Sequence, residues 1–165
     1  MTEILSEIEK LKQKLYLLLS QKNISLSTAE SCTGGMIGAC ITSIPGISSH
    51  YGYGFVTYSN EAKQELIGVS SQTLAKHGAV SAETALEMAE GALIKSGADI
   101  AVSVTGIAGP GGGTPLKPVG LVYVGLALKD KRLFKKLNLT GNREMIRLLT
   151  LKNVLELIIK QLENK

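Results

Sequence analysis

Three stretches of the chain combine glycine with polar or charged side chains, as in sites that bind anions. Residues 30–35 (ESCTGG) follow a short apolar segment, residues 106–113 are rich in glycine, and Arg143 and Arg147 stand four residues apart. Backbone N–H groups at the start of a helix hydrogen bond to oxyanions and phosphates, and two arginines on one helical face can grip a phosphate. Together the three stretches indicate an anion-binding site.

Ser31 has two interpretations from its local sequence. It follows a predicted strand and precedes Gly34 and Gly35, where helix N–H groups would lie beside a reacting hydroxyl. Alternatively, Ser31 or Thr33 simply caps the helix that follows. Cys32 is a rival nucleophile, but no histidine lies near it in sequence to activate the thiol, so we interpret it as a packing residue.

The other two stretches also have plainer interpretations. The loop 106–113 directly follows a predicted buried strand, which favours a phosphate site, but it could be a flexible crossover. Arg143 and Arg147 could form a solvated basic face instead of a phosphate site. The loop glycines that we expect to approach a ligand are Gly106, Gly109, Gly111 and Gly112.

Several named motifs are excluded by the residues present. The run from Gly34 to Gly38 lacks the first glycine of a dinucleotide fingerprint, because Thr33 stands there, and no G-x-x-x-x-G-K-[ST] sequence occurs. Ser31 is not in a G-x-S-x-G sequence, and no S-x-x-K motif with K-T-G is found. A Rossmann site, a P-loop, an α/β-hydrolase elbow and a penicillin-binding site are therefore not expected.

Composition limits the class of protein. A chain of 165 residues, 44% hydrophobic and 19% charged, is typical of one globular domain, here residues 1–165. The chain has two cysteines and two histidines, and a zinc site would need nearly all of them as ligands, so no metal is expected. No run of about 18 apolar residues occurs, and acids interrupt the apolar amino terminus, which predicts a cytoplasmic protein without membrane association.

Charge is uneven along the chain. Residues 129–165 hold 10 Lys and Arg against 4 Asp and Glu, whereas residues 1–128 hold 8 against 10. A basic patch can meet nucleic acid or a phosphorylated small molecule. Because the chain has no zinc-finger spacing and no aromatic-rich strand for stacking bases, we expect a small anion and no nucleic-acid partner.

Hydrophobic periodicity predicts alternating helices and strands. Nearly continuous apolar runs, as at 98–104 and 119–128, are typical of strands covered on both faces. This alternation predicts a three-layer α/β/α sandwich around a mixed, mainly parallel sheet, with the glycine loops converging on one cleft. The predicted helices are 3–22, 36–44, 81–96 and 145–162, and the predicted strands are 24–29, 51–58, 98–104, 119–128 and 133–139.

Four separated blocks of sequence occur in a characteristic order: TAESCTGG at 28–35, GYGFVTYSNEAK at 52–63, HGAVS at 77–81 and SVTGIAGPGGGTPLKPVGLVYVG at 103–125. Together they resemble the CinA carboxy-terminal family, and the similarity extends over roughly residues 5–162. Members of that family include nicotinamide-nucleotide amidohydrolases, which convert nicotinamide mononucleotide to nicotinate mononucleotide and ammonia. Some are fused behind a pyrophosphatase-type domain, and this chain resembles the standalone form.

The resemblance implies roles for individual residues. Ser31 would be the nucleophile and Lys63 its general base, and Tyr58 and Thr105 would line the reacting centre. We expect backbone N–H groups from Cys32 to Gly35 to bind the oxyanion. The resemblance implies a small nucleotide substrate, no metal or organic cofactor and a homo-oligomer. The alternative is a non-catalytic nucleotide-sensing or interaction domain associated with competence, which would keep the same pocket.

Overall fold

A five-stranded mixed sheet forms the centre of the computed structural model, which describes residues 2–164. Its strands lie in the order β2-β1-β3-β4-β5. Strand β1 pairs in parallel with β2 and β3, whereas β4 is antiparallel to both β3 and β5, so only β4 runs against the others. The strands are β1 Leu26–Glu30, β2 Tyr51–Val56, β3 Ile100–Gly106, β4 Leu121–Leu128 and β5 Lys131–Asn138.

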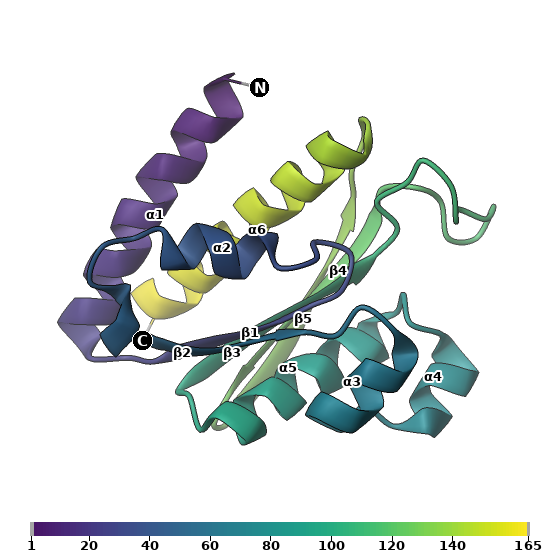
Figure 1. Cartoon of the computed structure of the whole chain (residues 1–165), viewed down its shortest axis with the longest axis horizontal. Helices are drawn as coiled ribbons and strands as arrows, with labels where there is room; N and C mark the ends of the chain where they lie inside the picture. The colour runs from purple at the N-terminus through teal and green to yellow at the C-terminus, as the bar shows by residue number, and fades with distance from the viewer. Residues whose placement is uncertain (1, 165) are drawn as a thin grey trace.

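Helices cover both faces of the sheet, which confirms the predicted three-layer architecture. Helices α1, α2 and α6 lie on one face, and α3, α4 and α5 lie on the other (Figure 1). Each layer shields the apolar side chains of the strands beneath it. The helices are α1 Thr2–Lys22, α2 Met36–Thr42, α3 Asn60–Ile67, α4 Ser71–His77, α5 Ala82–Ser96 and α6 Arg143–Glu163, with a short 3₁₀ helix η1 at Ile47–Ser49.

Two apolar clusters fill the space between the layers. The larger one joins α1, α2 and α6 to the sheet through residues such as Leu15, Ile37 and Ile158. The smaller one lies under α3, α4 and α5 and includes Ile67 and Met88. Burial of apolar area in these clusters is the main term that stabilises the fold.

Every predicted helix and strand is present, with ends shifted by a few residues. Strands β3 and β4 are buried on both faces, as their continuous apolar sequences predict. The helix predicted to begin after Ser81 is α5, in which Ser81 accepts a hydrogen bond from the backbone N–H of Thr84 and Gly97 ends the helix in a left-handed conformation.

Helices α3 and α4 were not predicted, and they correct the interpretation of Lys63. The predicted strand at 51–58 and the predicted helix at 81–96 left Lys63 in the connection between them, whereas it lies in the first half of α3. The two buried residues of α3 are Lys63 and Ile67, four apart on one face. Because one of them is a lysine, the apolar repeat that normally marks a helix is missing from the sequence.

Among residues 2–164, no helix is long and apolar enough to cross a membrane. Within the same range, no group of three or more His, Cys, Asp or Glu side chains is placed to hold a metal ion.

Candidate functional site

The site is built at the carboxyl end of the parallel strands. The backbone N–H of Ser31, the residue after β1, donates to the carbonyl of Val104 in β3 at 3.0 Å. On the other side, the N–H of Thr57, the residue after β2, donates to the carbonyl of Glu30 at 2.8 Å. Ser31 is therefore fixed between two neighbouring strands, at the sheet edge where ligands of α/β proteins bind.

The buried carboxylate of Glu30 organises the turn that follows Ser31. Its Oε2 accepts from the Thr33 hydroxyl at 2.7 Å and from the N–H groups of Gly35 and Ile37 at 3.0 Å each. Its Oε1 accepts from the N–H of Gly38 at 2.7 Å. These N–H groups belong to the first turn of α2, whose positive end favours a carboxylate. No pattern in the sequence marks Glu30 for this role.

Helix α3 positions Lys63 beside Ser31. Ser59 caps α3 by accepting from the N–H of Ala62 at 3.1 Å, and Lys63 follows within the first turn. Its Nζ lies 3.1 Å from the Oγ of Ser31. The Lys63 side chain is 1% exposed and Ser31 is 9% exposed, so the pair is almost fully enclosed.

The surroundings of the Lys63 amine favour its neutral form. Burial lowers the pKa of Lys63 below its ordinary value of 10.5, opposed by smaller Coulombic effects of Cys32 and Glu61. Besides Ser31, the amine contacts the carbonyl oxygens of Thr57 at 2.9 Å, Ser59 at 3.3 Å and Tyr58 at 3.4 Å. Two N–H bonds of a neutral amine directed at these carbonyls leave its lone pair for the Ser31 hydroxyl.

Ser31 and Lys63 open onto a pocket of about 240 Å³. Its walls come from the ends of β1 and β3, from α3, from the segment before α5 and from α6. The lining contains the cationic Arg143 and no carboxylate, which favours an anionic ligand. The residues that line it are Ser31, Cys32, Tyr58, Asn60, Lys63, Ala79, Val80, Thr105, Gly106, Ala108 and Arg143.

Tyr58, Thr105 and Arg143 lie where the sequence analysis expected site residues. The Thr105 hydroxyl donates to the carbonyl of Ala79 at 2.7 Å, which joins two walls of the pocket. Arg143 donates to the hydroxyl of Tyr58 at 3.0 Å and to the carbonyl of Gly109 at 2.8 Å. Tyr58 is 60% exposed, so its ring forms an open wall that a planar ligand can contact.

Of the glycines predicted to bind a ligand, some line the pocket and others do not. Gly106 lines the pocket, whereas Gly34 and Gly35 do not. Their N–H groups donate within the turn, Gly34 to the Ser31 carbonyl and Gly35 to Glu30. Both glycines have positive φ, 57° and 93°, a conformation that side chains rarely adopt. Within residues 2–164, the N–H of Thr33 donates to no protein acceptor, and the N–H of Cys32 contacts its own thiol and no backbone carbonyl.

The remaining predicted contacts lie outside the pocket lining. Gly109, Gly111 and Gly112 belong to the loop that projects beyond the sheet in Figure 1, and none of them lines the pocket. Arg147 donates to the carbonyl of Thr33 at 2.6 Å, so it braces the turn after Ser31. Its buried Nε atom has no hydrogen-bond partner among the described residues.

Cys32 lines the pocket, but its thiol is a poor nucleophile. Burial raises the pKa of Cys32 to about 11, and the Coulombic effect of Glu30 adds to the increase. A thiol must ionise to react at a useful rate, so Cys32 stays in the inert form near neutral pH. This agrees with its interpretation as a packing residue.

Sequence reasoning missed several residues of the pocket. Asn60, Ala79, Val80 and Ala108 line it, and none of them carries a signal that separates it from an ordinary loop residue. The block HGAVS, which contains Ala79 and Val80, was recognised only as part of the family resemblance.

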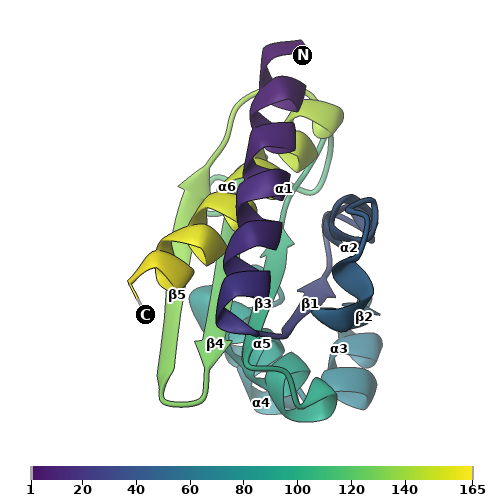
Figure 2. The same cartoon turned by 90° about the vertical axis from the view of Figure 1, so that its left-hand side faces the viewer.

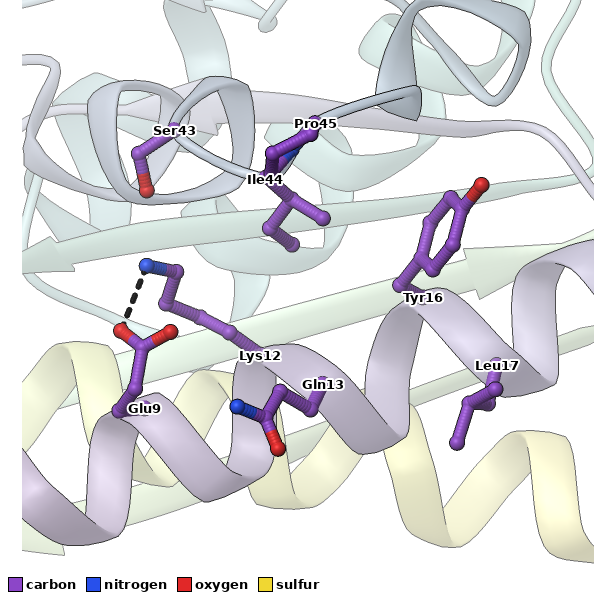
Figure 3. A pocket seen from close by; sticks show the side chains of 8 residues that line it. All are labelled: Glu9, Lys12, Gln13, Tyr16, Leu17, Ser43, Ile44 and Pro45. Carbon is purple, nitrogen blue, oxygen red and sulfur yellow. Dashed lines mark hydrogen bonds and ion pairs between the residues drawn. The ribbon is translucent and has the colours of Figure 1, made fainter.

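A larger cavity, of about 400 Å³, lies between α1 and the end of α2 (Figure 3). It also contains a serine and a lysine, Ser43 and Lys12. However, Lys12 is paired with Glu9 at 2.7 Å, and the Ser43 hydroxyl donates to the carbonyl of Cys40 at 2.6 Å. The cavity therefore offers no serine activated by a neighbouring base.

Comparison with known proteins points to one family. The family model of the CinA C-terminal domain matches residues 8–162. The solved structure of the competence/damage inducible protein CihA from Agrobacterium tumefaciens is 45% identical, with a TM-score of 0.91 over 93% of this chain and 94% of that one. A CinA superfamily protein from Klebsiella pneumoniae is 32% identical, with a TM-score of 0.92 over 96% of this chain and 99% of that one.

Curated relatives are longer than this chain. A relative in Caldanaerobacter subterraneus, named for competence-damage induction, is 48% identical over 157 residues, which are 95% of this chain and 38% of the relative. A CinA-like protein of Chloroherpeton thalassium is 60% identical over 114 residues, which are 69% of this chain and 27% of that protein. The chain thus spans less than two fifths of the length of these relatives.

Proposed function

We propose that this chain, which belongs to the CinA C-terminal domain family, hydrolyses the carboxamide of nicotinamide mononucleotide to give nicotinate mononucleotide and ammonia. The observation that carries the proposal is the 3.1 Å contact between the Lys63 amine and the Ser31 hydroxyl in an enclosed pocket. A serine attacks an amide only when a base removes its proton. The family resemblance supplies the substrate class.

In the first half-reaction, Ser31 becomes acylated. Neutral Lys63 takes the hydroxyl proton while Oγ bonds to the carboxamide carbon, which gives a tetrahedral oxyanion and a lysine ammonium. The oxyanion then reforms its carbonyl and the C–N bond breaks. Lys63 gives its proton to the departing nitrogen, so ammonia leaves and an acyl ester on Ser31 stays.

Water completes the cycle in the second half-reaction. Lys63, neutral again, takes a proton from water as the oxygen attacks the ester carbonyl. When the second tetrahedral intermediate collapses, the proton returns from Lys63 to the Ser31 oxygen, and the product leaves as a carboxylate after its acid loses the second water proton to solvent. This sequence uses one water per amide and consumes no metal or organic cofactor.

Backbone groups beside Ser31 are suited to bind the oxyanion. The N–H of Thr33 has no acceptor among residues 2–164, and the N–H of Cys32 contacts only its own thiol, so these are the donors that we assign to this role. Each such donor is typically worth about 3 kcal/mol in the transition state. Gly34 and Gly35, which we also expected to donate, instead shape the turn that aims these two groups.

The rest of the pocket suits the remainder of a pyridine nucleotide. Arg143 carries a positive charge at the pocket wall for the phosphate, with its guanidinium oriented by Tyr58 and Gly109. The exposed ring of Tyr58 offers a face to the positively charged pyridinium. Arg147 supports this arrangement from behind through its contact with Thr33.

The test is ammonia release from nicotinamide mononucleotide by the purified chain with a chelator present. We expect equal amounts of ammonia and nicotinate mononucleotide. Ser31→Ala should lose about 1,000-fold or more in kcat, and Lys63→Ala at least about 100-fold. Full activity in Ser31→Ala would show that the nucleophile is assigned wrongly.

Matched controls come from the larger cavity between α1 and the end of α2, which Figure 3 shows. Ser43→Ala and Lys12→Ala remove a serine and a lysine from a pocket without the paired geometry, so both should retain wild-type rates. If the ligand raises the melting temperature but no pyridine nucleotide yields ammonia, the chain is a nucleotide-sensing domain and the hydrolase proposal fails.

A further inference from the structure

Strand β5 forms one edge of the central sheet and concentrates the positive charge of the chain. Figure 2 shows it at the margin of the sheet, on the side away from β2. Residues 129–136, which comprise the hairpin turn and most of the strand, contain five basic residues and one acid. Their excess of positive charge equals the formal net charge of the whole chain, +4. The acids and bases of the rest of the molecule therefore balance each other.

Two lysines of this strand are held in position by neutral side chains. Lys131 donates to the amide oxygen of Gln161 in α6 at 2.8 Å, and Lys135 donates to that of Asn153 in the same helix at 2.8 Å. An amide carries no charge, so these bonds orient the two amines without cancelling their charge. Oriented cations that no acid neutralises are suited to bind a chain of anionic groups.

The opposite face of the strand combines cations with an exposed aromatic ring. Because successive side chains of a strand point to opposite faces, Arg132, Phe134 and Lys136 lie together on the side of α5. Phe134 is 49% exposed, and its ring lies beside that of Tyr123 in β4, with ring centroids 6.4 Å apart. Arg132 is paired with Glu90, which is the only acid of the described chain within ion-pair distance of a basic residue of this strand.

A cavity of about 330 Å³ lies where the hairpin turn before β5 meets the end of α6. Its lining includes Lys129, Lys131, Gln161 and Asn164, with Asp130 as its one acid. Side-chain amides both donate and accept hydrogen bonds, which is how Asn and Gln bind the edges of nucleobases. The basic strand therefore ends at a polar cavity whose volume is in the range of small-molecule sites.

We propose that the β5 surface, which comprises residues 129–136 with Tyr123, Gln161 and Asn164, binds single-stranded nucleic acid. The basic side chains would contact the phosphates, Phe134 would stack on a base, and the cavity would take up a neighbouring base. Aromatic stacking beside a row of cations is the general mode of single-strand binding. The sequence predicts no nucleic-acid partner because no single strand is rich in aromatic residues, whereas the pairing of β4 with β5 brings two rings together.

Charge and an exposed ring together favour this ligand over other anions. Charges that only protect an edge strand from pairing need no exposed phenylalanine between them. A duplex keeps its bases stacked on each other, so it offers no base face to the ring. Binding to an anionic lipid surface grows with the apolar area inserted, whereas β5, which the structure describes in full, exposes Phe134 as its one apolar side chain. This inference does not depend on the proposed hydrolase activity.

The test is fluorescence anisotropy of a dye-labelled oligothymidylate of about 15 nucleotides, titrated with the purified chain at several salt concentrations. The wild type should bind with a Kd on the order of 10 μM at about 50 mM salt. With three or four phosphates in contact with cations, the logarithm of the binding constant should fall with the logarithm of the salt concentration at a slope of about −2 to −3.

Two kinds of variant separate stacking from charge. Phe134→Ala should raise Kd about 10-fold because it removes the stacking ring, and it should leave the salt slope unchanged because it removes no charge. Lys136→Gln should raise Kd and reduce the magnitude of the slope by about 0.7, since one cation fewer meets a phosphate. Circular dichroism identifies a variant that fails to fold. If Phe134→Ala does so, Phe134→Leu decides, because leucine is also apolar but has no ring to stack on.

Matched controls make the same changes away from the β5 surface. Tyr53→Ala removes an aromatic residue of β2 that is 54% exposed, and Lys22→Gln removes an exposed cation at the end of α1. Both should bind as the wild type does. No binding at about 100 μM protein and about 50 mM salt overturns the proposal. It is also overturned by wild-type affinity in Phe134→Ala, by equal losses in the controls, or by duplex DNA or phosphatidylserine vesicles that bind as tightly as the single strand.

Discussion

Lys63 is the residue whose environment is most unusual for its type. A lysine is rarely fully buried unless it is paired with an acid, yet Lys63 is 1% exposed. Among residues 2–164, its amine hydrogen bonds only to carbonyl oxygens and the Ser31 hydroxyl. Burial lowers its pKa from 10.5, so the neutral amine is more populated than in water. The arrangement costs stability in the folded state, as do many catalytic groups.

This lowered pKa predicts the pH dependence of the proposed activity. Protonated Lys63 cannot accept the Ser31 proton, so kcat/KM should rise with pH through the pKa of Lys63 and level off below pH 10.5, the ordinary lysine value. The measurement is a pH profile of ammonia release, with protein stability checked at each pH. A rate independent of pH over this range would contradict Lys63 as the base.

For individual residues, the sequence alone indicated which residue types could take part in chemistry better than it indicated the role of each one. Local patterns left Ser31 open between nucleophile and helix cap, and the turn after it is in fact stabilised by Glu30, whose importance no pattern indicated. Lys63 and its partner are 32 residues apart, and only the family blocks suggested that they cooperate. Their contact depends on two separate elements meeting, which spacing along a chain cannot reveal.

Among the elements, the turn between β1 and α2 depends on one carboxylate. Glu30 accepts four hydrogen bonds from the Thr33 side chain and from the backbone of Gly35, Ile37 and Gly38. A glutamine in its place would keep the shape of the side chain. Its NH₂ group, however, would face the donors that now bond to one of the two carboxylate oxygens. The turn would then be free to move the proposed oxyanion donors away from the substrate.

Glu30→Gln should therefore lower kcat by at least about 10-fold with a smaller effect on KM, and should reduce the free energy of unfolding by about 2 kcal/mol. Urea denaturation and steady-state kinetics measure the two effects. Glu3→Gln, which alters an acid in the first turn of α1, is the control and should change neither. If the two variants behave alike, Glu30 does not organise the turn.

Close packing of α3 on α5 sets the position of Lys63. A Cβ atom at Gly91 in α5 would lie 1.8 Å from the carbonyl oxygen of Ile67 in α3, so only glycine permits this approach. Ile67 lies one turn after Lys63 on the same face of α3. A shift of α3 would consequently withdraw the amine from Ser31.

Gly91→Ala should lower the free energy of unfolding by about 1–3 kcal/mol through overpacking, although alanine normally stabilises a helix. It should also lower the rate of ammonia release in the folded protein. Gly111→Ala, at a site with open space around the new Cβ, should leave stability unchanged. A more stable Gly91→Ala protein would contradict the packing argument.

The sequence predicted the elements that follow a simple hydrophobic pattern. All five strands, α1, α2, α5 and α6 were identified, with errors of a few residues at their ends. Helices α3 and α4 were missed because each has few buried apolar residues, Ile67 in α3 and Leu74 in α4. Their caps, Ser59 and Ser70, are single serines, and serine is also common in turns that lead to no helix.

At the scale of the whole molecule, positive charge gathers toward the site. The chain has a formal net charge of +4, and its last 37 residues supply the excess. Through Arg143, helix α6 brings part of this charge to the pocket, whose lining contains no carboxylate. The fold thus places the basic end of the sequence beside Ser31 and Lys63. The uneven charge of the sequence indicated a basic patch but not its location.

This charge predicts how salt affects the proposed reaction. Added salt screens the attraction between Arg143 and a substrate phosphate, so kcat/KM for nicotinamide mononucleotide should fall about 3-fold or more between 50 and 500 mM salt, mainly through KM. Nicotinamide riboside lacks the phosphate and should react less efficiently, with little dependence on salt. Arg143→Gln should bring the mononucleotide to the same weak salt dependence, because it removes the charge while a side-chain amide can still bond to Tyr58. Equal salt dependence for both substrates in the wild type would mean that the phosphate is bound elsewhere, and Arg147, which is held against Thr33 on the same helix, would be the next residue to replace.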